Sequence, residues 1–253
     1  MTERKEPSPR ALVTGASSGL GLAISRALSA RGYVLTLVGR EEEKLNALAA
    51  ELPGSEGYPC DLSLRAQTRA LAEKLAAGDY EVLVNCAGFG LLGESSELGD
   101  AELEILEVNA CAAQILTCAF LRSATAGRIL NVASAAAFAP SPFFAAYAAS
   151  KSYVYSWSRA LSEELRAKKS RITLTTVCPG PLATPFDARA GGNPRRGMSP
   201  ETCAKIALSG LFRGKPLILP GGAKWGRLAA RLLPDWILVR AERRIQKRKT
   251  RKS

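Results

Sequence analysis

Three side chains that could transfer a proton occur within one short stretch of the chain: Ser134, Tyr147 and Lys151. Tyr147 and Lys151 are four residues apart in an alanine-rich run that is typical of a helix, so their side chains would share one helix face. A phenol has a pKa of about 10, and a neighbouring ammonium group stabilises the phenolate and moves that pKa toward neutrality. Such a pair also occurs on helices that do no chemistry, so the surrounding elements must decide whether it forms a site.

The segments around this stretch are predicted to be a strand and a helix. The run 128–134 is apolar and predicts a buried strand that ends at Ser134. Ser141 and Pro142 are typical of an N-cap followed by the first helical residue, so they predict the start of the helix that carries Tyr147. A strand end that faces a helix is a common place for chemistry in α/β proteins.

The alternation of short apolar strands and amphipathic helices continues along the chain. It indicates an α/β fold: a single doubly wound, Rossmann-type domain at 10–222, whose mostly parallel, seven-stranded sheet has helices on both faces. We expect a disordered lead at 1–9 and a basic amphipathic tail at 223–253. A long helix is predicted at 100–124 and a long loop at 181–198. The strands are predicted at 10–14, 33–39, 57–60, 80–85, 128–134, 171–178 and 216–220.

A glycine-rich turn follows the first predicted strand, at the sheet edge where doubly wound folds bind ligands. Gly15, Gly19 and Gly21 would let backbone N–H groups and a helix N-terminus approach a phosphate, which predicts a dinucleotide-binding turn. The overlapping pattern Gly15-Ala-Ser17-Ser-Gly19 also matches the nucleophile elbow of α/β-hydrolases. That alternative needs a histidine to accept the serine proton, and the chain contains none.

The residues after the second predicted strand favour one nicotinamide cofactor over the other. A carboxylate there binds the ribose 2′-hydroxyl of NAD(H), whereas a basic group suits the 2′-phosphate of NADP(H). Gly39 is followed by Arg40, and a guanidinium group can pair with phosphate through two hydrogen bonds. We therefore expect NADP(H) rather than NAD(H); a surface arginine without this role is the alternative.

The composition excludes several other kinds of site. The lack of histidine excludes Ser-His-Asp triads, Cys-His triads and HExxH metal sites. The six cysteines include no Cys-x-x-Cys pair and mostly lie in apolar segments, which favours buried reduced thiols over disulfides or metal ligands. No apolar run reaches the length of about 18 residues that a membrane span requires, and no signal-peptide core follows the polar N-terminus. We therefore expect a cytoplasmic protein with no metal site.

Taken together, the chain resembles a classical short-chain dehydrogenase/reductase over about residues 10–220. Each motif is weak alone, but their order and spacing are specific, including the 13 residues from Ser134 to Tyr147. The family more often has asparagine where Cys86 stands. The motifs are Thr14-Gly-Ala-Ser-Ser-Gly-Leu-Gly21, Asp61, Asn85-Cys-Ala-Gly88, Asn109, Ser134, Tyr147-Ala-Ala-Ser-Lys151 and Pro179-Gly-Pro-Leu-Ala-Thr184.

The resemblance implies an NADP(H)-dependent oxidoreductase that transfers a hydride between the nicotinamide and a carbonyl or alcohol substrate. Tyr147 would be the general acid/base, Lys151 would also hold the nicotinamide ribose, and Asp61 would contact the adenine ring. Ser134 would bind the substrate oxygen, and Asn109 would anchor a water chain that resupplies the proton. The resemblance also implies a homo-dimer or homo-tetramer. The catalytic residues would be Ser134, Tyr147, Lys151 and Asn109; the cofactor-binding residues would be Gly15, Ser17, Ser18, Gly19, Leu20, Gly21, Arg40, Asp61, Leu62, Asn85, Ala87, Gly88, Tyr147, Lys151, Pro179, Gly180, Leu182 and Thr184.

Three loops, at 89–99, 135–146 and 181–198, are expected to form the walls of the substrate site. Their apolar residues favour an apolar carbonyl or alcohol substrate. Arginines in the third loop would suit an anionic group such as a coenzyme A thioester, although solvation at the surface is the favoured interpretation. The apolar residues are Leu91, Leu92, Phe138, Phe143, Phe144 and Phe186, and the arginines are Arg189, Arg195 and Arg196.

The tail is the other unusual feature. From Arg213 onward the chain has 13 Lys and Arg but only 2 Asp and Glu, so this part carries most of the net charge of +12. Apolar residues recur between the basic ones, as in segments that lie on an anionic membrane surface, which would bring the protein to the inner membrane surface. A packed helix with a solvated charged end is the main alternative, and nucleic-acid binding is the least favoured.

A second function class follows from the tail. The protein could be a non-catalytic dinucleotide-binding scaffold or sensor, attached to membrane or nucleic acid by its basic end. The complete set of Ser134, Tyr147 and Lys151 favours the enzyme instead.

Overall fold

Seven parallel strands form one sheet in the computed structural model, in the order β3-β2-β1-β4-β5-β6-β7. The structure describes residues 8–193 and 196–250, so most of the predicted lead at 1–9 lies outside the described residues. The doubly wound α/β fold predicted from the sequence is confirmed, and the sheet is parallel throughout. The strands are β1 (Arg10–Thr14), β2 (Val34–Gly39), β3 (Glu56–Pro59), β4 (Val82–Asn85), β5 (Gly127–Val132), β6 (Ile172–Val177) and β7 (Leu217–Ile218).

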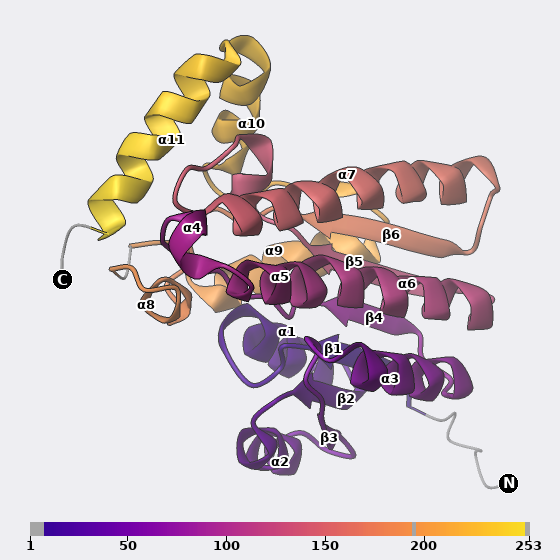
Figure 1. The fold of residues 1–253 in the computed structure, drawn as a ribbon. Helices are drawn as coiled ribbons and strands as arrows, with labels where there is room; N and C mark the ends of the chain where they lie inside the picture. The colour runs from indigo at the N-terminus through magenta and orange to yellow at the C-terminus, as the bar shows by residue number, and fades with distance from the viewer. Residues whose placement is uncertain (1–7, 194–195, 251–253) are drawn as a thin grey trace, which may run out of the picture.

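The strands are apolar on both faces because helices cover both sides of the sheet. In β1, Ala11 and Val13 belong to one apolar core, and Leu12 between them belongs to the other. The first core is covered by α1 (Gly19–Ser29), α2 (Glu42–Glu51) and α9 (Pro200–Phe212). The second core is covered by α3 (Arg65–Ala77), α6 (Ala112–Ser123) and α7 (Ala145–Ala167), and Figure 1 shows this layer along the sheet.

The helix predicted at 100–124 is interrupted. The structure has α5 (Ala101–Leu106), a π-helical turn η1 (Glu107–Cys111) and then α6. In a π-helical turn each hydrogen bond joins residues five apart rather than four, as in an α-helix. This turn contains Asn109. The segment 101–123 is long and apolar enough to cross a membrane, but half of it is buried and it packs against α3 and α7 as a core helix does.

The predicted start of the helix that carries Tyr147 is wrong. Helix α7 begins at Ala145 with Phe144 as its N-cap residue, whereas Ser141 and Pro142 precede the helix. The hydroxyl of Ser141 is engaged elsewhere: it donates to Glu242 and accepts from Gln246. By contrast, Ser199 caps α9 by accepting from the backbone N–H of Thr202, with Pro200 as the first helical residue.

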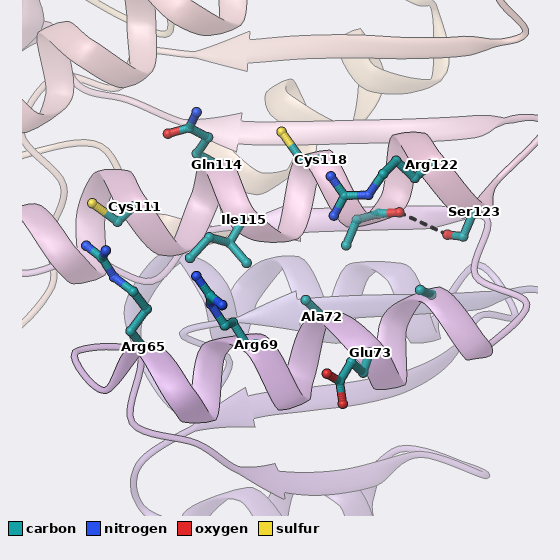
Figure 2. A pocket seen from close by; sticks show the side chains of 12 residues that line it. Arg65, Arg69, Ala72, Glu73, Cys111, Gln114, Ile115, Cys118, Arg122 and Ser123 are labelled. Atoms are coloured by element: carbon teal, nitrogen blue, oxygen red, sulfur yellow. Dashed lines mark hydrogen bonds between the residues drawn. The ribbon is translucent and has the colours of Figure 1, made fainter.

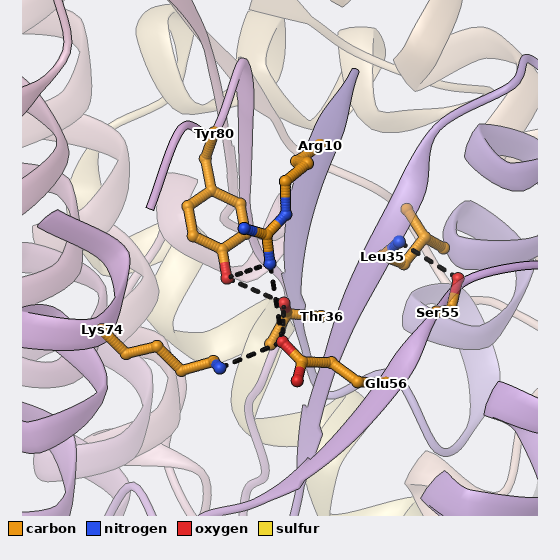
Figure 3. A network of polar contacts seen from close by, with 7 residues as sticks. All are labelled: Arg10, Leu35, Thr36, Ser55, Glu56, Lys74 and Tyr80. Atoms are coloured by element: carbon orange, nitrogen blue, oxygen red, sulfur yellow. Dashed lines mark hydrogen bonds and ion pairs between the residues drawn. The ribbon is translucent and has the colours of Figure 1, made fainter. Parts of the chain in front are cut away.

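A polar network joins the amino ends of the strands, at the edge opposite to the predicted site (Figure 3). Glu56 at the start of β3 lies 3.0 Å from Lys74 of α3 and accepts a hydrogen bond of 2.8 Å from Thr36 of β2. Tyr80 and Thr36 share a bond of 2.8 Å, and the Arg10 guanidinium lies over the Tyr80 ring. The network ties the exposed edge strand β3 to the body.

The predicted tail forms two helices, α10 (Ala223–Leu232) and α11 (Asp235–Thr250). Figure 1 shows this pair beyond one end of α7, with α11 standing outside the layers of the fold. Three short helical segments lie at the same end of the molecule: α4 (Ser95–Leu98), the 3₁₀ turn η2 (Ala135–Phe138) and α8 (Phe186–Arg189).

Candidate active site

The predicted site residues follow the carboxyl ends of the strands, around the point where the strand order reverses between β1 and β4. Thr14 at the end of β1 joins the two halves, because its hydroxyl oxygen accepts from the backbone N–H of Cys86, at 3.0 Å, and of Ala87, at 3.1 Å. The Asn85–Gly88 turn is therefore held directly beside the glycine turn.

The glycine turn is too tight for larger residues. A Cβ on Gly21 would lie 2.1 Å from the carbonyl oxygen of Gly15, and Gly15 itself has a φ of 68° and would bring a Cβ within 2.9 Å of Ala87. Ser17, Ser18 and Gly19 are partly exposed at the start of α1, whereas Leu20 points into the apolar core. The turn thus presents backbone N–H groups and two hydroxyls at a helix N-terminus, which suits a phosphate.

Tyr147 and Lys151 are buried together on α7, with 9% and 4% of their surface exposed. The Lys151 Nζ donates to the backbone carbonyl of Val132, at 3.0 Å, and lies 5.8 Å from the centre of the Tyr147 ring. Burial lowers the pKa of Lys151 to about 8, while the nearby Cys86 and Cys178 act in the opposite direction. The predicted pairing of a phenol with a buried ammonium group is therefore present.

Asn109 is joined to Lys151 through Gly88. A Cβ on Gly88 would lie 3.0 Å from Asn109 Oδ1 and 3.1 Å from Lys151 Nζ, so the three residues meet at one point. Asn109 accepts from the N–H of Phe89, at 3.0 Å, and donates to the carbonyl of Phe89, at 2.9 Å. It also donates to Ser150, which in turn donates to the carbonyl of Tyr147. The π-helical turn thus connects the 87–93 loop to the start of α7.

Ser134 lies just after β5 and opens the 3₁₀ turn η2, where its hydroxyl accepts from the N–H of Ala136, at 3.1 Å. Ala136 packs in the apolar cluster that contains Tyr147. Ala135, which directly follows Ser134, donates its backbone N–H to the carbonyl of Pro179, at 2.8 Å. This bond holds the Pro179–Gly180 turn after β6 next to η2.

Asn85 is turned away from the strand end. Its side-chain amide donates to Asn131, at 2.8 Å, and to Thr117, at 3.0 Å, inside the protein. Asn131 in turn donates to Ser158 of α7, at 2.9 Å. The side chain therefore joins β4, β5, α6 and α7. Cys86 beside it is a neutral thiol, because burial raises its pKa to about 12.

The residues after β2 and β3 form the side of the site expected for the adenosine. Arg40 is exposed. Burial raises the pKa of Asp61, but two hydrogen bonds from Ser63 and the charge of Arg40 outweigh it and hold the carboxyl below its ordinary pKa. Leu62 is buried in the second apolar core. Arg40 is therefore available to an anion, while Asp61 is already engaged in closing its own turn.

The loop predicted at 181–198 contains the short helix α8 and lies over the site. Leu182 pairs with Met198, which closes the base of the loop, and Thr184 lies next to Gly19. Within α8, Phe186 packs on Tyr147 with 5.3 Å between ring centres. The carbonyl of Ala190 accepts from the N–H of Leu92, at 2.9 Å, and so ties the 181–198 loop to the 89–99 loop.

Arg189 is exposed, as expected for a solvated arginine, and its guanidinium also donates to the hydroxyl of Ser18 in the glycine turn, at 3.1 Å. The pKa of Glu41 is lowered mainly by the adjacent Lys44, and Arg189 and Arg40 add to this effect. Both guanidinium groups therefore lie near the same corner of the cofactor turn. Arg195 lies outside the described residues.

The walls beside Tyr147 are apolar, as predicted, but not all the predicted residues take part. Leu91, Leu92, Phe144 and Phe186 pack around Tyr147 with Ile105 and Ala190. Phe138 instead packs edge-on against Tyr155, with 5.2 Å between ring centres, in a different cluster. Phe143 stands outside this cluster too, and its φ of 63° is strained for a residue with a side chain.

A separate cavity lies away from this site. It is an open groove of about 720 Å³ between α3 and α6, lined by Arg65, Arg69, Arg122 and Cys118 among others (Figure 2). None of the predicted catalytic or cofactor-binding residues lines it. In the part of the chain that the structure describes, no cluster of three His, Cys, Asp or Glu could hold a metal, and the six cysteines are free thiols.

The sequence does not reveal the positioning roles of four residues: Thr14, Ser150, Asn131 and Arg189. The first three act through hydrogen bonds between segments that are far apart in the sequence, and no local pattern announces such bonds. Arg189 was noticed, but its partner Ser18 is 171 residues away. Leu20, Leu62 and the side chain of Asn85 point into the protein. The glycine turn, the two guanidinium groups and Lys151 have the chemistry that suits a phosphorylated dinucleotide.

Known proteins agree with this architecture. A sequence profile of the short chain dehydrogenase family matches residues 9–195. Nodulation protein G of Rhizobium sp. (strain N33) is 37% identical over 178 residues, which cover 68% of this chain and 72% of that protein. A short-chain dehydrogenase from Sphingobium yanoikuyae, in complex with NADPH, has a TM-score of 0.79 at 29% identity and covers 88% of this chain and 93% of its own.

A short-chain dehydrogenase/reductase from Burkholderia phymatum, in complex with NAD, has a TM-score of 0.78, covering 89% of this chain and 92% of its own. At 23% identity this likeness concerns the fold alone. The profile covers most of the chain, and the relative is more than 30% identical over two thirds of it. The chain belongs to the short-chain dehydrogenase/reductase family.

Proposed function

We propose that the protein is an NADP(H)-dependent oxidoreductase that interconverts a carbonyl compound and an alcohol, with Tyr147 as general acid/base. The observation that carries the proposal is the pairing of the buried Tyr147 and Lys151, with Lys151 next to Gly88 in the turn that Thr14 holds beside the glycine turn. A bound nicotinamide cofactor would supply or accept the hydride. The protein would bind the cofactor and the substrate, orient them, and exchange a proton with the substrate oxygen.

Each residue has a definite role in this proposal. Tyr147 donates a proton from its phenol to the substrate oxygen during reduction and takes it back during oxidation. Protonated Lys151 stabilises the phenolate electrostatically. Ser134 donates a hydrogen bond to the substrate oxygen, and its position at the start of η2 is fixed by the N–H of Ala136. Asn109 holds the 87–93 loop and, through Ser150, the backbone of Tyr147; a water chain from Asn109 would resupply the proton.

NADP(H) is proposed over NAD(H) because basic groups surround the expected position of the adenosine phosphate. Arg40 follows β2 where an acidic residue would favour NAD(H), and Ser17, Ser18 and Arg189 face the same turn. Among the similar structures, the Sphingobium enzyme contains NADPH, whereas the more distant Burkholderia enzyme contains NAD.

The proposed substrate is an apolar ketone or the corresponding alcohol. Tyr147 is surrounded by the apolar side chains of Leu91, Leu92, Phe144 and Phe186. We also propose a homo-dimer or homo-tetramer that forms through α6 and α7, because the stacked rings of Tyr153 and Trp157 lie on that face and Tyr153 bonds Gln114 of α6. Light scattering after gel filtration would measure the oligomeric state.

The replacement Tyr147→Phe tests the central role. It removes one hydroxyl from a buried ring, so NADPH binding should change little, while turnover should fall by about 10²-fold or more because general acid catalysis is lost. The measurement is NADPH oxidation against a panel of apolar ketones, with NADPH binding followed by fluorescence. Turnover close to that of the wild type would refute the assignment of Tyr147, and an inert wild-type protein that still binds NADPH would favour the scaffold alternative.

A further inference from the structure

The pair of helices α10 and α11 carries five large apolar side chains that point into solvent. Trp225 is 64% exposed, Leu232 is 72% exposed and Trp236 is 59% exposed. Leu228 and Leu233 between them are 45% and 44% exposed. We call these five residues the hairpin patch. Single exposed apolar residues are ordinary on protein surfaces, but two tryptophans and three leucines in one twelve-residue segment indicate an interaction site.

The spacing places three residues of the hairpin patch on one side of α10. Trp225, Leu228 and Leu232 are separated by three and four residues, so they lie on one helix face. Lys224, Arg227 and Arg231 lie on a different face of the same helix, at one side of the apolar stripe. A short helix with an apolar stripe and a basic face is typical of segments that lie in a membrane interface.

Helix α11 also carries an exposed tryptophan next to basic residues. Trp236, Arg240 and Arg243 share a helix face, and the Arg240 guanidinium lies 5.1 Å from the centre of the Trp236 ring. On α10, the ammonium group of Lys224 lies 5.3 Å from the centre of the Trp225 ring. Tryptophan next to a basic residue suits the boundary between lipid headgroups and acyl chains, since the ring and the cation can both be accommodated there.

Contacts with the protein body hold the hairpin in place while the patch stays exposed to solvent. Helix α11 is fastened by Gln246, which is 5% exposed and donates to Ser141, at 2.9 Å. Glu242 accepts from the same serine, at 3.2 Å. Helix α10 packs against η2 at its base, where Ala223 is buried. Figure 1 shows the pair standing clear of the sheet and its helices, with its other sides open.

Charge decides between the possible occupants of this surface. A second copy docked on the patch would bring two sets of arginines together, which costs energy because like charges repel. A nucleic acid would use the arginines but would leave the aliphatic part of the patch in water. An anionic lipid surface uses both features at once, since its headgroups pair with the basic residues and its acyl region accepts the tryptophans and leucines.

We propose that the α10–α11 hairpin binds peripherally to anionic lipid membranes. The helices are 10 and 16 residues long, shorter than the 20 or so residues that a helix needs to cross the hydrocarbon core, so they would lie in the interface. The hairpin packs against η2 and the Ser141 loop, and these segments also border the site of Tyr147. This inference does not depend on the reaction that the site catalyses.

The test is co-sedimentation of the full chain with vesicles of phosphatidylcholine alone or mixed with phosphatidylglycerol. We expect binding to the mixed vesicles that weakens with salt and is much weaker on phosphatidylcholine alone. The triple variant Trp225→Ser, Leu232→Ser, Trp236→Ser should lower the affinity for mixed vesicles by about 100-fold, because it removes the apolar part of the interaction. The double variant Arg240→Gln, Arg243→Gln should lower it by about tenfold.

The matched control is Leu64→Ser, Leu103→Ser, which removes two apolar side chains of similar exposure, 51% and 58%, from another surface. This control should bind vesicles as the wild type does, and circular dichroism should show that all variants are folded. Absence of wild-type binding to mixed vesicles would overturn the proposal, as would equal binding by the triple variant. Gel filtration with light scattering supplies another contrary result: dissociation of an oligomer by the triple variant, with no vesicle binding by the wild type, would assign the patch to a second copy.

Discussion

Lys151 is subject to two opposing demands at the scale of a single residue. Burial disfavours its charged form and lowers its pKa from 10.5 to about 8. The proposed mechanism nevertheless requires the charged form, because only an ammonium group stabilises the Tyr147 phenolate. The carbonyl of Val132 compensates for part of the lost solvation by accepting a hydrogen bond at 3.0 Å. A residue that is costly to bury and retained at the centre of a crevice is typical of a functional site.

The replacement Lys151→Met should therefore change activity and stability in opposite directions. The folded-state pKa is depressed, so the unfolded chain binds more protons between pH 8 and 10.5; the destabilisation is complete below about pH 8 and disappears above about pH 10.5. At pH 7 we expect Lys151→Met to raise the free energy of unfolding by about 2–3 kcal/mol. Turnover should fall by about 10²-fold or more.

Denaturant unfolding at pH 7 and at pH 10.5 checks this prediction, since the gain should shrink at the higher pH. Lys215→Met, at an exposed residue, is the control and should show neither effect. A variant that is less stable than the wild type at pH 7 would contradict the proposed cost of the buried charge.

At the scale of elements, the sequence predicts the type and order of the strands and helices well, and the details of their ends poorly. Seven strands and the glycine turn follow from patterns of neighbouring residues, and the structure confirms the fold. The start of α7 was misplaced because Ser141 and Pro142 satisfy the local rule for an N-cap, while a distant segment engages the serine. The π-helical turn at Asn109 was also missed, because its extra residue is stabilised by contacts to Phe89 and Ser150.

For the candidate site too, the sequence predicts which residues take part but not how all of their side chains are oriented. Residues with a recognisable motif, such as Tyr147, Lys151 and Gly88, could be named from the sequence and lie together in the structure. Asn85 could be named as well, but its side chain turns inward to Asn131 rather than toward the crevice. The orientation of a side chain depends on partners from other elements, and one sequence does not reveal them.

The short helix α8 links the two halves of the crevice. One of its residues, Phe186, packs on Tyr147, and another, Arg189, donates to Ser18 of the glycine turn. We expect Arg189 to move from this neutral hydroxyl to a cofactor phosphate, because a charge-assisted hydrogen bond is stronger. Arg189→Gln should then weaken NADPH binding by roughly tenfold and affect NADH less.

Fluorescence titration with NADPH and NADH provides the measurement, and Arg213→Gln at the exposed end of α9 is the control. Equal loss of affinity for both cofactors would indicate that Arg189 contacts a phosphate they share. Unchanged affinity for both would show that Arg189 only fastens the loop. A wild-type protein that binds neither cofactor would refute the proposed function itself, independently of this residue.

At the scale of the whole molecule, the part of the chain that carries the net positive charge is also the part that forms the helices α10 and α11. The chain before Arg213 is almost neutral in total, whereas the part from Arg213 onward carries nearly all of the net charge of +12. The described residues of this basic part include the two helices α10 and α11. The hairpin is attached to the body where α10 packs on η2 with Ala223 buried, and where Glu242 and Gln246 bond Ser141 of the loop before α7. The hairpin is thus a separate layer that one apolar contact and one small polar cluster fasten to the body.

The replacement Ser141→Ala should loosen that layer without altering the fold. It leaves the buried amide of Gln246 without its partner on the body, which costs about 1–2 kcal/mol and raises the population of the detached hairpin by about 5–30-fold. Trypsin should then cut within 224–248 correspondingly faster, because this segment is rich in arginine and lysine. Ser123→Ala is the matched control, since that hydroxyl bonds only its own helix. Equal cleavage rates for Ser141→Ala and the wild type would show that other contacts hold the hairpin in place.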